Sequence, residues 1–297
     1  MQSAFPFVKG VKEFLHYRGR RLLRRPHERD FEVIRLLSKY ENSFVDVGAN
    51  LGQSIESILI FRPDAHIVSF EANPSLAEKL RRRYAAQPNI KVYSTGLGDG
   101  PGEFTLYIPS YNGYVYEGLA SFKRDAAEGW LPCAIYGFKK SKHSIYEVRC
   151  KSEMLDSFRL APDFLKIDVQ GWEYNVLIGA RKTLAQHEPV LLIEIYDDPR
   201  IDALLREYGY REYFLDKGRL APGRGPDPLN LLFVTERRIG PMVDRCTKAD
   251  TDTRFATAPQ LRDVALARRE DFARVLCLRG YDIPGAHVRP SDPRPWH

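Results

Sequence analysis

Short apolar runs alternate with helical patterns from Ser43 to Val234, and this alternation constrains the fold more than any other feature of the chain. Buried strands are predicted at 44–47, 67–70, 90–93, 164–169, 190–195, 213–215 and 231–234. Helices are predicted at 52–61, 74–84, 173–184 and 200–208. Strands that alternate with helices at this spacing form a mostly parallel sheet with helices on both faces. We therefore predict a doubly wound α/β fold.

The limits of this alternation divide the 297 residues into three parts. We expect a basic helical N-terminal extension at 1–42, a main domain at 43–235 and a C-terminal helical tail at 236–297, in which 259–278 has the clearest helical pattern. An aromatic-rich insertion without clear periodicity occupies 109–145 of the main domain. Two interpretations of the insertion stay open: a lid whose rings stack on a ligand, or a satellite core packed on the sheet.

Positive charge is concentrated at the N-terminus. The first thirty residues hold eight Lys and Arg against three acidic residues, which accounts for five of the six net positive charges. The remainder is close to neutral, which argues against a nucleic-acid partner bound across a basic face. The apolar residues among the first fifteen recur at helical spacing. They predict either a helix that lies on an anionic membrane surface or a helix that packs on the sheet.

The four cysteines give no sign of a metal site or a disulfide framework. Cys133, Cys150, Cys246 and Cys277 never occur at CxxC spacing. Lys9 and Lys12 interrupt the apolar residues near the N-terminus, so no signal peptide is predicted. We expect a cytoplasmic protein in which the thiols stay reduced.

The run Asp46-Val47-Gly48-Ala49-Asn50-Leu51-Gly52-Gln53 joins a predicted strand to a predicted helix. Glycines at such a turn let the backbone approach a ligand, and the helix that follows presents unpaired N–H groups. A dinucleotide fingerprint would have glycine where Asn50 and Gln53 stand. An anionic Asp46 at the strand end favours a cationic nucleoside ligand over a pyrophosphate.

Two further acidic positions follow predicted strands. Glu71 comes about twenty residues after the glycine turn, where a carboxylate can accept both ribose hydroxyls of a nucleoside cofactor. Asp168 lies at the carboxyl end of another strand, where open α/β sheets bind ligands. Lys166, two residues before Asp168, faces the same side of the strand, and we expect the two to pair.

These motifs resemble those of the FkbM family of class I methyltransferases. The resemblance covers 43–234 and rests on Asp46–Gly52, Phe70–Pro74, Leu155–Asp156, Leu165–Glu173, Val176–Ala180 and Glu194. It implies a Rossmann-like sheet of about seven strands, S-adenosylmethionine as methyl donor and O-methylation of a sugar, glycolipid or polyketide-type product. The chain has Ala72 where the family commonly has proline, and its aromatic insertion is longer than expected.

The predicted site follows from the motifs and the resemblance together. The residues predicted to bind the cofactor are Asp46, Gly48, Ala49, Asn50, Gly52, Glu71, Ala72 and Asn73. Asp168 is the predicted general base for the acceptor hydroxyl, with Glu173 and Glu194 as lesser candidates and His143 as an outside one. No ligand spacing supports a metal, so none is predicted.

Two other classes of function remain as alternatives. One is a nucleotide-sugar or NAD-dependent enzyme on a related fold, which the missing glycines disfavour. The other is a non-catalytic adaptor that binds the cofactor. In the leading interpretation the partner is a small-molecule or glycan acceptor.

Overall fold

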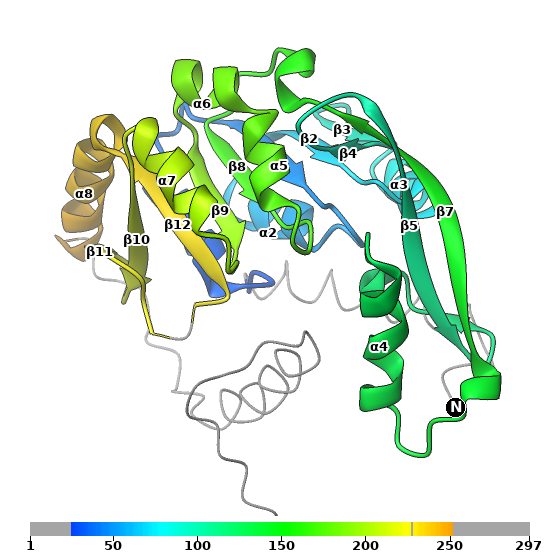
Figure 1. Ribbon diagram of the computed structural model, residues 1–297. Coiled ribbons are helices and arrows are strands. Elements are labelled where there is room, and N and C mark those ends of the chain that lie inside the picture. Colours follow the sequence, from blue (N-terminus) through cyan, green and yellow to red (C-terminus); the bar gives the residue numbers. More distant parts are fainter. Residues whose placement is uncertain (1–24, 227, 252–297) are drawn as a thin grey trace, which may run out of the picture.

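The computed structural model describes residues 25–226 and 228–251, and these form an α/β structure around one large sheet (Figure 1). The sheet has eight strands. In spatial order they are β3 (Ile90–Tyr93), β2 (His66–Phe70), β1 (Ser43–Val47), β8 (Phe164–Ile167), β9 (Val190–Glu194), β12 (Asn230–Thr235), β10 (Tyr210–Asp216) and β11 (Arg219–Pro222). The five strands from β3 to β9 pair in parallel, and β12, β10 and β11 pair antiparallel with their neighbours. The predicted Rossmann-like, mostly parallel sheet is confirmed, with β11 as an extra edge strand.

Helices cover both faces of this sheet, because alternate residues of its buried strands are apolar on both sides. Phe44 packs on one face with the 3₁₀ helix η2 (Arg29–Leu36), α2 (Gln53–Phe61), α3 (Pro74–Arg83) and α8 (Glu236–Thr251). Val45 packs on the other face with α5 (Glu173–Ile178), α6 (Arg181–His187) and α7 (Pro199–Glu207). Residues of η2, within the predicted extension, are fully buried in the first of these cores.

The prediction of one continuous helix over 173–184 was wrong. The segment forms α5 and α6, which are separated at Gly179 and Ala180. A Cβ atom on Gly179 would lie 1.9 Å from the carbonyl oxygen of Gly98, so the backbone of another loop occupies the side-chain space there. Asp156 then accepts hydrogen bonds from the backbone of Lys182 (2.8 Å) and Thr183 (2.9 Å), which begins a new helix.

A second, four-stranded sheet projects from the main one (Figure 1). Its long strands β5 (Gly102–Tyr111) and β7 (His143–Glu153) pair antiparallel along nearly their full length, with β4 (Gly96–Leu97) and β6 (Tyr114–Val115) beside them. The insertion between these strands contains α4 (Arg124–Ala134), which lies beside β5. This hairpin and α4 form an arm on one side of the site.

Two predicted segments lie outside the described residues: the apolar helix near the N-terminus and the tail helix at 259–278. Within residues 25–226 and 228–251, no helix is both long enough and apolar enough to cross a membrane.

Candidate active site

The turn between β1 and α2 is held in a left-handed backbone conformation at three positions. The φ angles are 89° at Gly48, 48° at Asn50 and 87° at Gly52. A Cβ atom on Gly48 would lie 1.8 Å from the carbonyl oxygen of Asp168, so only glycine fits where the ends of β1 and β8 meet. The turn therefore brings the backbone of Gly48 and Asn50 to the wall of a cavity at the carboxyl ends of the strands.

Glu71 follows β2 and stabilises this turn through a hydrogen bond. Its carboxylate oxygens accept hydrogen bonds from the backbone N–H of Asn50 (2.6 Å) and of Asn73 (2.8 Å). The side chain is only 7% exposed, and burial raises the pKa of Glu71 to about 7, although both backbone bonds oppose the rise. An ionised carboxylate offers about four acceptor positions. Two therefore remain to receive hydroxyl groups from a ligand.

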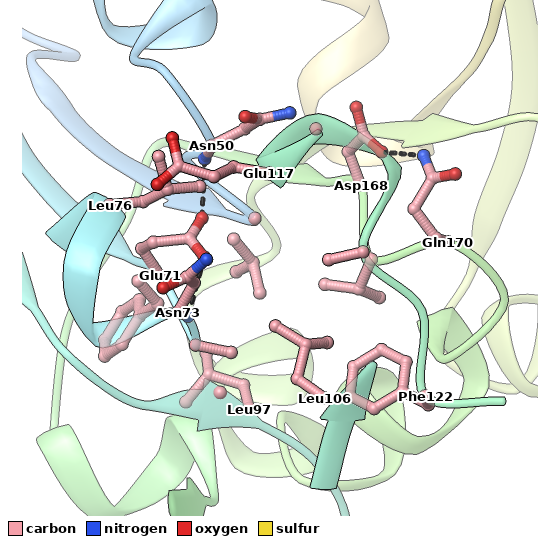
Figure 2. A pocket seen from close by; sticks show the side chains of 18 residues that line it. Asn50, Glu71, Asn73, Leu76, Leu97, Leu106, Glu117, Phe122, Asp168 and Gln170 are labelled. Atoms are coloured by element: carbon pink, nitrogen blue, oxygen red, sulfur yellow. Dashed lines mark hydrogen bonds between the residues drawn. The ribbon is translucent and has the colours of Figure 1, made fainter. Parts of the chain in front are cut away.

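Figure 2 shows the cavity, with Glu71 and Asn73 on one side and Asp168 and Gln170 on the other. Apolar residues complete the lining: Leu97, Leu106 and Phe122 lie along the lower edge of the view, and Phe70 and Leu76 also line the cavity. Two buried polar atoms in the lining residues, Asn50 Oδ1 and Asn73 Nδ2, have no hydrogen-bond partner among the described residues. The lining thus combines apolar side chains with polar groups.

The predicted cofactor residues divide into two groups. Gly48, Asn50, Glu71, Ala72 and Asn73 line the cavity. The other three, Asp46, Ala49 and Gly52, lie behind the wall and do not border it.

Asp46 is fully buried on β1, where its Oδ2 accepts a hydrogen bond from Ser69 at 2.6 Å. Burial raises the pKa of Asp46 to about 6. From this position Asp46 would act on a ligand through its charge and not through direct contact.

Asp168 and Glu194 are brought together by Gln170. The Gln170 amide donates to Asp168 Oδ1 (3.0 Å) and to Glu194 Oε2 (2.8 Å). The Asp168 side chain is 32% exposed, and its Oδ2 lies 3.6 Å from Lys166 Nζ, as expected from their positions on the strand. Asp168 and Gln170 line the cavity, whereas Glu194 does not.

Glu173 and His143 occupy positions that do not fit the roles considered for them. The Glu173 side chain is buried and accepts hydrogen bonds from the backbone of Gly171 (3.0 Å) and Val169 (3.3 Å), so it fixes the loop that follows β8. His143 begins β7 at the far end of the arm, with its ring against Phe138, and is not part of the cavity wall. Asp168 is therefore the predicted base that borders the cavity.

Residues of the insertion cover the cavity. The 3₁₀ turn η3 (Glu117–Leu119) places Glu117 and Gly118 in the cavity wall, and Glu117 forms an ion pair of 2.7 Å with Lys79 on α3. Phe122 also lines the cavity, and its ring stacks on that of Trp172, with centroids 5.6 Å apart. The insertion had no periodicity from which these contacts could be predicted. The packing of Phe122 on Phe104 and Trp172 agrees with the satellite-core interpretation, and the lid interpretation stays a prediction.

The fold and the site together define an open α/β protein with a cavity at the carboxyl edge of its sheet, where such folds bind ligands. Among the described residues, no three His, Cys, Asp or Glu side chains converge as metal ligands. The methyltransferase FkbM domain model matches residues 46–212, more than half of the chain. The chain belongs to the FkbM methyltransferase family.

The sequence of this chain is similar to those of two proteins, a synthetase and a methyltransferase. AMB antimetabolite synthetase AmbE of Pseudomonas aeruginosa is 29% identical over 203 residues, which cover 56% of this chain and 9% of that protein. The 2-O-methyltransferase NoeI of Sinorhizobium fredii is 24% identical over 170 residues, which cover 52% of this chain and 64% of that protein. The chain thus spans less than two thirds of the length of either relative.

Similar solved structures include methyltransferase FkbM from Methylobacillus flagellatus KT. Its TM-score is 0.43 at 18% identity, covering 70% of this chain and 48% of that one. Fibrillarin from Aeropyrum pernix has a TM-score of 0.37 at 13% identity, covering 73% of each chain.

Membership in this family assigns S-adenosylmethionine as the cofactor. The residues present fit that molecule. Glu71 would accept the ribose hydroxyls at its two remaining acceptor positions, and the apolar lining would contact the base. The buried polar atoms of Asn50 and Asn73 would be available for further hydrogen bonds, and Asp46, when ionised, would add negative charge near the cationic sulfonium.

Proposed function

We propose that the protein is an S-adenosylmethionine-dependent O-methyltransferase, and that its acceptor is a hydroxyl group of a sugar, glycolipid or polyketide-type product. The observation that carries this proposal is the position of Asp168 and Gln170. Both line the cofactor cavity, and Gln170 also borders a second, larger groove beside the arm. Asp168 itself does not border the groove, but Gln170, which holds its carboxylate, does, and this supports a role for Asp168 toward an acceptor bound in the groove.

S-adenosylmethionine supplies an electrophilic methyl group when it is bound. A hydroxyl group is a weak nucleophile, so a carboxylate that takes its proton while the O–CH₃ bond forms contributes to the rate. Asp168 has this role in the proposal. Gln170 holds Asp168 Oδ1 and thereby fixes the orientation of the carboxylate. Alignment of the two reactants by the cavity and the groove supplies a further part of the acceleration.

The lining of the groove argues against an anionic acceptor. Its volume is 1250 Å³, above the roughly 300–1,000 Å³ of a typical small-molecule pocket, so it has room for more than one sugar ring. The Trp172 side chain is 39% exposed and forms part of the lining with Phe122. The charged lining residues are Asp99, Glu103, Lys123, Asp125, Glu173, Asp197, Asp198 and Arg200. This excess of carboxylates favours hydroxyl donors and disfavours anionic acceptors.

The name of one relative agrees with an oxygen acceptor, because NoeI is a 2-O-methyltransferase. The proposal also includes a cytoplasmic location, since the cysteine content suits a reducing compartment. Peripheral membrane contact through the basic N-terminus is testable by co-sedimentation with anionic vesicles. Salt-sensitive binding that disappears when residues 1–24 are removed would support such contact.

Transfer of radiolabelled methyl groups tests the proposal. The acceptors are neutral methyl glycosides and hydroxylated polyketides, with the corresponding uronic acids as anionic controls. We expect transfer to a neutral hydroxyl, with kcat at least about 100-fold lower in Asp168→Asn and cofactor affinity changed much less. Trp172→Ala is expected to raise the acceptor KM by a larger factor than it weakens binding of S-adenosylhomocysteine. Methylation confined to amines or thiols, or full activity in Asp168→Asn, would contradict the proposal.

A further inference from the structure

A buried lysine lies beneath the active-site edge of the sheet. The Lys166 side chain on β8 is only 1% exposed. Its ammonium group donates a hydrogen bond to Asn230 Oδ1 at 2.8 Å and lies 3.6 Å from Asp168 Oδ2. Burial of a cation in a sheet is costly unless partners compensate it, so the partners of Lys166 determine whether it is stable there.

The partners that hold this lysine come from two distant parts of the chain. Asn230 begins β12 and is 6% exposed. Its amide group donates to Glu28 Oε2 at 2.8 Å and to Asp30 Oδ2 at 3.0 Å, while its carbonyl oxygen accepts from Lys166. The result is a continuous chain of contacts from residues 28 and 30, through Asn230 and Lys166, to Asp168. Glu28, Asp30 and Asn230 all lie outside the matched FkbM domain at 46–212.

The Lys166 ammonium group interacts electrostatically with several surrounding carboxylates. Burial by itself lowers the pKa of Lys166, but Asp168, Glu28, Glu194 and Asp46 offset this effect and hold the pKa above its usual value. The acidic groups that interact with Asp168 or Lys166 from the packed elements are Glu28, Asp30, Asp46, Glu71, Glu173 and Glu194. With so much negative charge nearby, an adjacent ammonium group favours the ionised form of Asp168.

We propose that Lys166 is a positioning residue for Asp168, and that Asn230, Glu28 and Asp30 hold it in place. Lys166 draws Oδ2 of Asp168 toward the sheet, while Gln170 holds Oδ1 at the cavity. The carboxylate is thereby fixed from both sides in its proton-accepting form. This inference rests on the proposed function, in which Asp168 takes the proton of the acceptor hydroxyl. It assigns part of the active site to segments on either side of the FkbM domain.

The first test measures the titration of Asp168 without any acceptor. Protein labelled with ¹³Cγ aspartate is titrated by NMR, and the resonance absent from Asp168→Asn identifies Asp168. Lys166→Met keeps an unbranched apolar stem and removes the ammonium group, and is expected to raise the titration midpoint of Asp168 by about one pH unit. Asn230→Ala and Glu28→Gln retain Lys166 and are expected to raise the midpoint by less. These two variants decide the matter if Lys166→Met does not fold.

The second test measures methyl transfer to the methyl glycoside that the wild type methylates fastest. Lys166→Met is expected to lower kcat at least about tenfold, with the acceptor KM within about twofold, and to move the acidic limb of the pH profile upward. In the Asp168→Asn background the same substitution is expected to have no further effect on kcat, because it acts through Asp168. Tyr210→Phe is the control. It removes another buried hydrogen bond, to the Pro189 carbonyl at 2.9 Å, far from the site, and is expected to retain kcat.

The outcomes separate this inference from the function on which it rests. If Asp168→Asn transfers methyl groups at the wild-type rate, the proposed base and this inference are both overturned. If Asp168→Asn is slow but the Lys166, Asn230 and Glu28 variants keep the wild-type titration and kcat, only the role of Lys166 is overturned. Equal losses from Lys166→Met in both backgrounds would also overturn it.

Discussion

Glu71→Gln is expected to weaken binding of S-adenosylhomocysteine and to remove its pH dependence near neutrality. Glutamine retains one carbonyl acceptor, but its amide group cannot accept from the backbone N–H of Asn50 or Asn73, both of which the carboxylate now satisfies. The variant therefore loses one charge-assisted hydrogen bond to the ligand. In addition, its side-chain NH₂ group faces a backbone N–H group, so that two donors oppose each other. The expected loss is about 2–4 kcal/mol, or roughly 30- to 1,000-fold in Kd.

The pH dependence follows from the pKa of about 7 for Glu71. Two hydroxyl groups are best accepted by the ionised carboxylate, which is lost as the pH falls through 7. At about pH 6 only a tenth of the carboxylates are ionised, so wild-type affinity is expected to be about tenfold lower than at about pH 8. Asp46, with a pKa of about 6, adds to the loss at still lower pH. In Glu71→Gln the tenfold change is expected to disappear.

Isothermal titration calorimetry at both pH values measures these effects. Glu78→Gln is the matched control, because Glu78 lies on the exposed surface of α3 and pairs with Arg82 at 2.8 Å. It is expected to bind as the wild type does. If Glu71→Gln binds within about threefold of the wild type, or if wild-type affinity is equal at both pH values, the assignment of the ribose to Glu71 is wrong.

Three further predictions concern residues that support the structure around the site. Gly48→Ala is expected to cost roughly 3 kcal/mol or more in unfolding free energy, because its Cβ atom would meet a carbonyl oxygen at 1.8 Å. Gly100→Ala has open space and is the control in chemical denaturation, so similar values for the two would refute the argument. Asp156→Ala is expected to cost about 1–3 kcal/mol, since it removes the cap of α6, and to retain kcat per folded molecule; unchanged stability would contradict this. Lys79→Met opens the ion pair with Glu117 and is expected to raise the dissociation rate of S-adenosylhomocysteine by up to about fivefold in stopped flow, as an exposed pair allows. An unchanged rate would show that this ion pair does not hold η3 over the cavity.

The local parts of the fold could be predicted because their signals lie within short stretches of sequence. The strands β1, β2 and β3 and the helices α2 and α3 follow from apolar periodicity bounded by glycine and proline. The residues at the ends of those strands then meet, since parallel strands end at one edge. Gly48 and Glu71 could therefore be assigned to one site without knowledge of their contacts.

Long-range packing decided the features that could not be predicted. The break between α5 and α6 depends on the backbone of Gly98, about eighty residues earlier in the chain. The pair of Lys166 and Asn230 is separated by 64 residues and has no local signal. In both cases the partner is fixed by topology rather than by pattern.

The cofactor cavity and the proposed acceptor groove have one wall in common, formed by Ala120, Phe122 and Gln170. We expect a molecule bound on one side of this wall to limit its motion and so to favour binding on the other side. The factor by which the acceptor then strengthens retention of S-adenosylhomocysteine equals the factor by which S-adenosylhomocysteine strengthens retention of the acceptor. A screen in saturating S-adenosylhomocysteine is therefore expected to detect weaker acceptors than a screen with the bare protein.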